Sequence, residues 1–142
     1  MRTRILAIAV ALCVLAAVLL AWRQFRGGEP LTVQALGAAS PEAVELTQWA
    51  TAVRQAGRGG ARIVAERFHA QVPVDRREAL ARQIALRLLA AEQPGPYSLR
   101  ASSNGGIQAV WKCPPAADRP AELSLLFVCG EQGRLALSGL MP

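Results

Sequence analysis

Few side chains in this 142-residue chain could carry acid–base, metal or redox chemistry, and they are scattered along it. His69 is the only histidine, which removes most proton-transfer pairs and all multi-histidine metal sites. Glu66 and His69 have the Glu-x-x-His spacing of metal sites in helical bundles, but those sites need a second such pair and the chain has none. We therefore expect no metal site and no cofactor, and an exposed or capping role for His69.

The motifs of other catalytic classes are absent from the sequence. There is no Cys-x-x-Cys for thiol exchange, no Cys-x-x-Cys-His for haem attachment and no Gly-x-Ser-x-Gly around a nucleophile. The glycines at 57–60 lie between predicted helices, and 104–106 form a predicted hairpin turn, so neither is a phosphate-binding loop. Asp75 and Glu78 are better explained as acids at a helix start than as catalytic carboxylates. The chain is predicted not to be an enzyme, and no small-molecule substrate is identified.

Cys113 and Cys129 are the remaining candidates for chemistry. A cysteine pair in an oxidising compartment is most simply a disulfide, and closing a loop of this size would contribute roughly 3 kcal/mol. We therefore predict a Cys113–Cys129 disulfide. A plain meander would instead place the two residues at opposite ends of adjacent strands, on the order of 20 Å apart, whereas a disulfide needs Cα atoms within about 7 Å. The bond thus requires the proline-rich segment 114–121 to carry the chain back along the sheet; otherwise the thiols stay reduced.

An uncharged apolar run from Ile5 to Trp22 precedes all of these residues. Its length is close to the roughly 20 residues that a helix needs to cross a bilayer core. A cleavable signal peptide is the alternative, but Leu15 and Leu19 stand where a cleavage site would need small residues. The short basic N-terminus, with Arg2 and Arg4, is typical of the cytoplasmic side. The predicted order is a cytoplasmic N-terminus (1–4), a transmembrane signal anchor (5–22), a linker (23–40) and a periplasmic domain (41–142).

Much of the chain's net positive charge comes from the residues that flank this run. Four of the sixteen basic residues flank it, which leaves the rest of the chain at a net charge of only +2 against ten acids. The other arginines, Arg67 and Arg87 among them, are interleaved with acids as on solvated helix faces. Because no basic block with interleaved aromatic residues occurs, we expect no nucleic-acid partner.

Helical signals dominate the first half of the predicted domain. Ser40 and Pro41 give a cap and a first-turn proline, and Trp49 lies on the apolar face of a helix that the glycines at 57–60 end. A helix is also expected over 61–72. Asp75 and Glu78 predict a capping box ahead of the strongest helix, 76–92.

From Tyr97 onward the apolar residues alternate, which predicts strands. Two hairpins are expected, with turns at 103–106 and 130–133, and a short strand is expected within 31–36. Helices followed by antiparallel strands predict an α+β domain, with two to three helices packed on a sheet of about four strands.

The leading functional hypothesis is a non-catalytic accessory or assembly subunit of a bacterial envelope complex, for instance in secretion, pilus, conjugation or respiratory assembly. The chain would be a single-pass protein of the inner membrane, with the lipid bilayer and other envelope proteins as partners.

Two alternatives remain open. An apolar N-terminal helix followed by a further helix, an antiparallel sheet and a C-terminal cysteine pair resembles the type IV pilin layout, which implies a pilin-like subunit. Pilins have a leader ending in glycine and a glutamate near the start of the apolar stretch, whereas here no glycine precedes Ile5 and no acid interrupts the run. The other alternative is a periplasmic small-ligand binding module, which exposed Trp111 or Tyr97 would favour. The alternation places both on apolar strand faces, so we expect them in the core.

Overall fold

The computed structural model describes residues 12–22, 31–116 and 118–141, and divides the chain into two compact units, Met1–Leu31 and Thr32–Pro142. In the first unit, residues 12–22 are helical. Among the residues described, no helix combines the length and apolar character needed to cross a membrane. Residues 5–11 of the predicted anchor lie outside the described residues.

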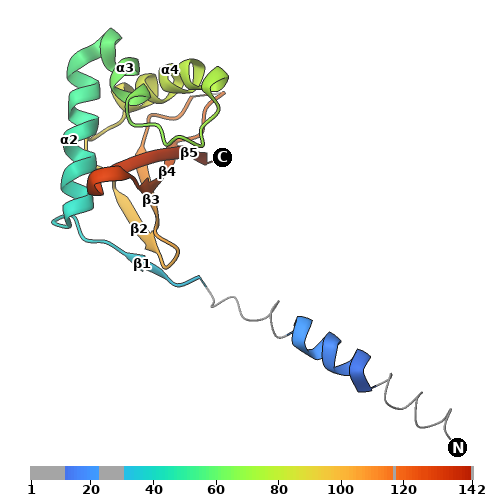
Figure 1. Ribbon diagram of the computed structural model, residues 1–142. Helices are drawn as coiled ribbons and strands as arrows, with labels where there is room; N and C mark the ends of the chain where they lie inside the picture. Colours follow the sequence, from blue (N-terminus) through green and yellow to red (C-terminus); the bar gives the residue numbers. More distant parts are fainter. Residues whose placement is uncertain (1–11, 23–30, 117, 142) are drawn as a thin grey trace, which may run out of the picture. The chain divides into compact units, whose positions relative to one another are not determined.

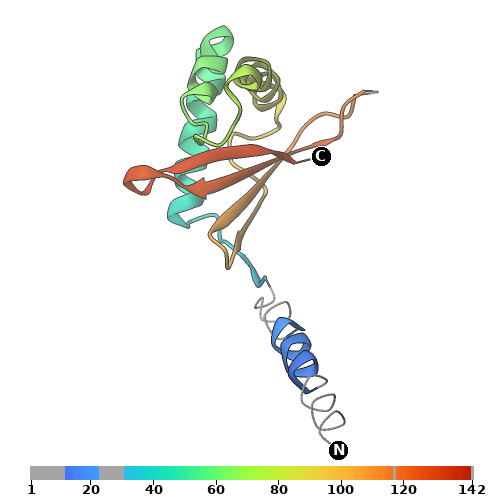
Figure 2. The ribbon, with the colours of Figure 1, turned by 45° about the vertical axis from the view of Figure 1, so that its right-hand side comes forward.

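The second unit is an α+β domain with three α-helices on a five-stranded antiparallel sheet, which confirms the predicted fold class (Figures 1 and 2). The helices are α2 (Pro41–Ala56), α3 (Gly60–Ala65) and α4 (Val74–Ala90). The strands are β1 (Val33–Ala35), β2 (Ser98–Ser102), β3 (Gly106–Lys112), β4 (Glu122–Cys129) and β5 (Leu135–Met141). They lie side by side in chain order; β2 to β5 form a plain meander, whereas the three helices connect β1 to β2.

Strand β1 lies inside the segment predicted as a linker, and it makes the sheet one strand larger than expected. It pairs antiparallel with β2, with Gln34 opposite Ala101. The short strand expected within 31–36 is therefore confirmed, and its pairing with β2 joins residues 33–35 to the domain.

The start and end of α2 follow the sequence signals. The Ser40 hydroxyl accepts a hydrogen bond from the Ala43 amide at 3.2 Å, and Pro41 occupies the first turn. Gly57 ends the helix with a φ of 55°, a left-handed conformation that residues with a Cβ seldom adopt.

The predicted cap of α4 was wrong. The helix begins at Val74, and no side chain caps it. The Arg77 side chain instead reaches back and donates to the carbonyls of Val72, at 2.9 Å, and of His69, at 3.3 Å. Asp75 is therefore inside the helix, and an arginine of the first turn organises the chain entering it.

The helix expected over 61–72 is much shorter, because the chain after α3 pairs with the sheet. The Leu137 amide donates to the Arg67 carbonyl at 2.6 Å, and the His69 amide donates to the Leu137 carbonyl at 2.8 Å. Phe68 thereby forms a parallel bridge with Leu137. Backbone groups that a longer helix would have used cover part of the outer edge of β5.

The core lies between the helices and one face of the sheet. Trp111 and Phe127 are fully buried there, and Trp49 of α2 packs edge-on against both, with ring centroids 6.4 Å and 5.6 Å away. The predicted core positions of Trp49 and Trp111 are confirmed. Tyr97 was predicted wrongly, since 49% of its surface is exposed.

Candidate functional site

The two cysteines outside the N-terminal run are free thiols that lie far apart. The Cys113 amide donates to the Ala121 carbonyl at 2.7 Å, so Cys113 lies beside the start of β4, whereas Cys129 ends that strand. Eight residues of strand at about 3.3 Å each separate those two positions by about 25 Å. The sheet has the meander in which the predicted Cys113–Cys129 bond cannot close, because the segment after Cys113 does not return along the sheet.

Cys113 lies in a closed polar corner between β3 and α4. Its Sγ is 3.5 Å from the Arg87 carbonyl, and burial raises the pKa of the thiol. The Arg87 guanidinium is itself buried and donates to the carbonyls of Pro120, at 2.8 Å, and Glu122, at 2.6 Å. The expectation that Arg87 lies on a solvated face was therefore wrong, because it fixes the connection that leads into β4.

Cys129 lines an open cleft of about 790 Å³ between the β4–β5 hairpin and the chain that follows α3. His69, Arg77 and Arg134 also line it. The His69 Nδ1 atom accepts a hydrogen bond from the Gln71 amide at 3.3 Å, which is a local turn contact. The part of the chain that the structure describes contains no group of three or more potential metal ligands.

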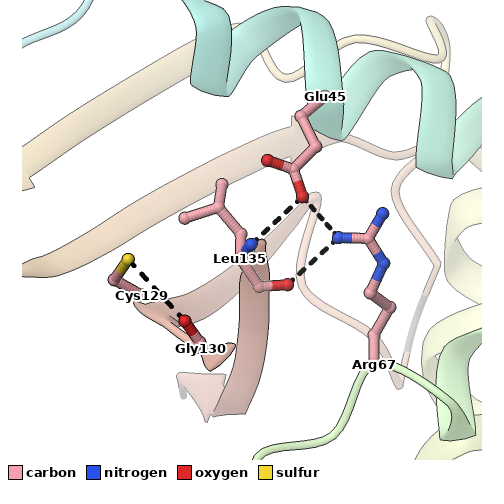
Figure 3. A network of polar contacts seen from close by, with 5 residues as sticks. All are labelled: Glu45, Arg67, Cys129, Gly130 and Leu135. Atoms are coloured by element: carbon pink, nitrogen blue, oxygen red, sulfur yellow. Dashed lines mark hydrogen bonds and ion pairs between the residues drawn. The ribbon is translucent and has the colours of Figure 1, made fainter. Parts of the chain in front are cut away.

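A network at the rim of this cleft ties α2 to the hairpin (Figure 3). The Glu45 carboxylate accepts hydrogen bonds from Arg67 Nη1 at 2.5 Å and from the Leu135 amide at 3.1 Å. Arg67 also donates to the Leu135 carbonyl at 3.1 Å. Arg67 Nη1 thus bridges the Glu45 carboxylate and the Leu135 carbonyl, and the network holds the hairpin in position against α2.

Tyr97 joins β2 to the start of β4 at the surface. Its phenol donates a hydrogen bond to the Glu122 carboxylate, and Lys112 Nζ lies 5.0 Å from the ring centroid. The hydrogen bond to Glu122 raises the pKa of the phenol. This polar end explains why Tyr97 stays out of the core, whereas the buried Trp111 indole finds its partner in the Pro94 carbonyl, to which it donates at 2.9 Å.

The side of the sheet turned away from the helices, here called the open sheet face, carries a second and smaller groove. The groove holds about 240 Å³ and has Arg100 as the only charged residue in its lining. The lining residues are Val33, Arg100, Ser102, Asn104, Gly106, Gln108, Leu126, Val128 and Met141. Beside it the Gln108 side-chain amide donates to the Ser124 hydroxyl at 3.0 Å. The groove is therefore largely apolar, and its one cation, Arg100, forms no ion pair among the described residues.

Local sequence signals do not single out this face. Arg100 and Gln108 belong to the polar half of an alternating pattern, which is what any half-solvated strand shows. One signal in the sequence could have indicated this face. Leu126 and Val128 are apolar, although the alternation along β4 directs their side chains away from the core.

No protein-family model, no curated protein and no solved structure matches this chain in the three comparisons with known proteins.

Proposed function

We propose that this chain is a non-catalytic accessory or assembly subunit of a bacterial envelope complex, anchored in the inner membrane by residues 5–22. In this proposal the domain lies in the periplasm and uses the open sheet face to bind an extended segment of another envelope protein. The observation that carries the proposal is the groove around Arg100 on that face.

The composition of the groove defines the chemistry of its partner. Leu126, Val128 and Met141 offer apolar surface, and Arg100 offers a guanidinium suited to a carboxylate. A segment with apolar side chains and one acidic side chain would complement it. An interface of this kind gains specificity from the charge and affinity from the buried apolar area.

The N-terminal run supports the membrane anchor. All described residues of this helix are exposed, including Leu12, Leu15 and Leu19 at about 60%. A helix that is apolar on every side is stable only inside a protein core or in lipid. From Trp22 to Val33 the chain can extend at most about 40 Å, at about 3.5 Å per residue. An anchor at 5–22 would therefore hold the domain close to the bilayer, within reach of other membrane proteins.

Co-purification tests the groove. The full chain with a C-terminal affinity tag is solubilised from membranes, and stoichiometric partners are identified. Reversing the charge with Arg100→Glu should lower the amount of recovered partner at least about tenfold. This corresponds to a loss of about 1.4 kcal/mol in binding free energy. Arg76→Glu, which changes an exposed arginine of α4, is the matched control and should leave recovery unchanged. Equal recovery from both variants would remove the groove from the interface.

A topology reporter tests the compartment. A reporter fused to the C-terminus should show that end on the periplasmic side, and the chain should stay with membranes after an alkaline wash. A cytoplasmic C-terminus would contradict the envelope proposal.

A further inference from the structure

We propose that two copies of this chain pair through the outer edge of β1, antiparallel and about a two-fold axis at Gln34, so that two five-stranded sheets join into one. This inference concerns the strand edge, although the Val33 side chain also lines the groove on the open sheet face. It requires no membrane partner, so it stands apart from the proposed function.

The two edges of the sheet are treated differently by the fold. At β5 the segment 67–69 supplies backbone partners on both sides of Leu137. At β1 no described residue pairs with the outer edge, and all three strand residues are exposed. An edge left open in a monomer is normally protected by a very short strand, a charge, a proline or a bulge. β1 is short, with three residues, but its Val-Gln-Ala sequence has no charge and no proline, and no bulge interrupts its pairing with β2.

The hydrogen bonds to β2 show which backbone groups point outward. The Leu36 amide donates to the Leu99 carbonyl at 2.8 Å, and the Ser103 amide donates to the Thr32 carbonyl at 3.0 Å. In an antiparallel ladder, bonded residues alternate, so residues 32, 34 and 36 face β2. The amides and carbonyls of Val33 and Ala35 are therefore directed to the free edge.

This spacing is self-complementary. A two-fold axis at Gln34 places Val33 opposite the partner's Ala35, and Ala35 opposite the partner's Val33. Each of these pairs can exchange both of its hydrogen bonds, which satisfies every outward-facing group of the strand. The Gln34 side chains of the two copies would meet in the non-bonded pair between them, where side-chain amides can donate to each other. A second copy thus fits the edge without any further segment.

Charge does not oppose the pairing. β1 carries no charge, and the nearest cation of the sheet is Arg100, one strand away. The two Arg100 positions in the paired sheet would lie about 14 Å apart, at about 4.8 Å per strand, which exceeds the Debye length of about 8 Å at physiological salt. The like charges would therefore be largely screened.

Site-directed crosslinking of the full chain in cells tests this register. Cys13, Cys113 and Cys129 are first replaced by alanine, and single cysteines are then introduced. Gln34→Cys should give a disulfide-linked homodimer under mild oxidation, because the axis brings the two positions to about 4.5–5.5 Å between Cα atoms. Val33→Cys alone should crosslink at least about fivefold less, since its two copies would be about 8 Å apart. Co-expressed Val33→Cys and Ala35→Cys chains should crosslink to each other.

A second variant separates pairing from folding. Val33→Pro removes an amide that points to the free edge and takes no part in bonding β2, so the domain should fold and the Gln34→Cys crosslink should fall at least about fivefold. Val33→Ala, which keeps the amide, is the matched control and should retain the crosslink. Circular dichroism melting verifies that both variants fold. The inference is overturned if the Gln34→Cys chain stays monomeric, if it links to a different protein, or if Val33→Cys and Gln34→Cys crosslink equally.

Discussion

The two faces of the sheet use neighbouring residues of the same strands in opposite ways. On β4, Phe127 is fully buried against Trp49, whereas Leu126 and Val128 on either side of it remain partly exposed on the open sheet face. The covered face stores most of the apolar burial that stabilises the domain. The side chains of the open sheet face already contact solvent in the folded domain. A partner can therefore bind this face without any part of the domain unfolding.

The strongest test of this comparison is a pair of truncations on β4. Phe127→Ala should destabilise the domain by about 3–5 kcal/mol, because it removes a buried ring and leaves a cavity beside Trp49. Leu126→Ala should cost about 1 kcal/mol or less, since that side chain is already partly in water. Urea denaturation of the two variants measures the difference. Similar losses for both would mean that the open sheet face is also part of the core.

The second test compares a partly buried carboxylate with an exposed one. Glu45→Ala should cost about 1–3 kcal/mol, because it leaves the Leu135 amide and the Arg67 guanidinium without their acceptor. Glu66→Ala, which removes a surface pair with Arg62, should change stability by less than about 0.5 kcal/mol. The same denaturation series reports both. A Glu45 variant as stable as the Glu66 variant would show that the hairpin holds its position without α2.

The third test uses the two thiols of the sheet. In a Cys13→Ser chain, Cys129 should react rapidly with a maleimide, and Cys113 only after unfolding, because Cys113 is buried. Burial raises the pKa of Cys113 above its ordinary 9.0, so the folded state keeps the proton at a pH where the unfolded chain has lost it. Stability should therefore fall as the pH rises past that value, and Cys113→Ala should reduce the fall. Mass spectrometry and alkaline melting curves measure these effects. Equal rates for both thiols in the folded chain would contradict the buried corner.

The smallest effect is expected at the surface corner formed by Tyr97. Because Tyr97 is the only tyrosine, the tyrosinate absorbance reports this phenol alone. It should titrate above the ordinary 10.0, since the hydrogen bond to Glu122 favours the neutral phenol, and Glu122→Gln should bring the pKa back toward that value. An identical titration in both chains would mean that the hydrogen bond does not form in solution.

The α+β class and most element positions were predictable from local signals. Ser40 with Pro41, the glycine at 57, and the alternation from residue 98 onward each act over a few neighbours, so one sequence reveals them. The capping box predicted at Asp75 was wrong, because a local signal does not reveal a competing contact from elsewhere in the fold. The competing contact, Arg77 to the carbonyls before the helix, depends on a loop whose path the pattern does not encode.

What the sequence determined by itself is the set of faces: which residues of each helix and strand seek apolar surroundings, and therefore that Trp49 and Trp111 belong to the core. What the tertiary structure alone decided is how those faces are placed. It fixed the meander that separates Cys113 from Cys129, the burial of Arg87, the covered edge at β5 and the open one at β1. The physical reason is range, because hydrophobic periodicity is a property of neighbouring residues, whereas edges, clefts and hydrogen-bond partners arise from segments distant in the chain.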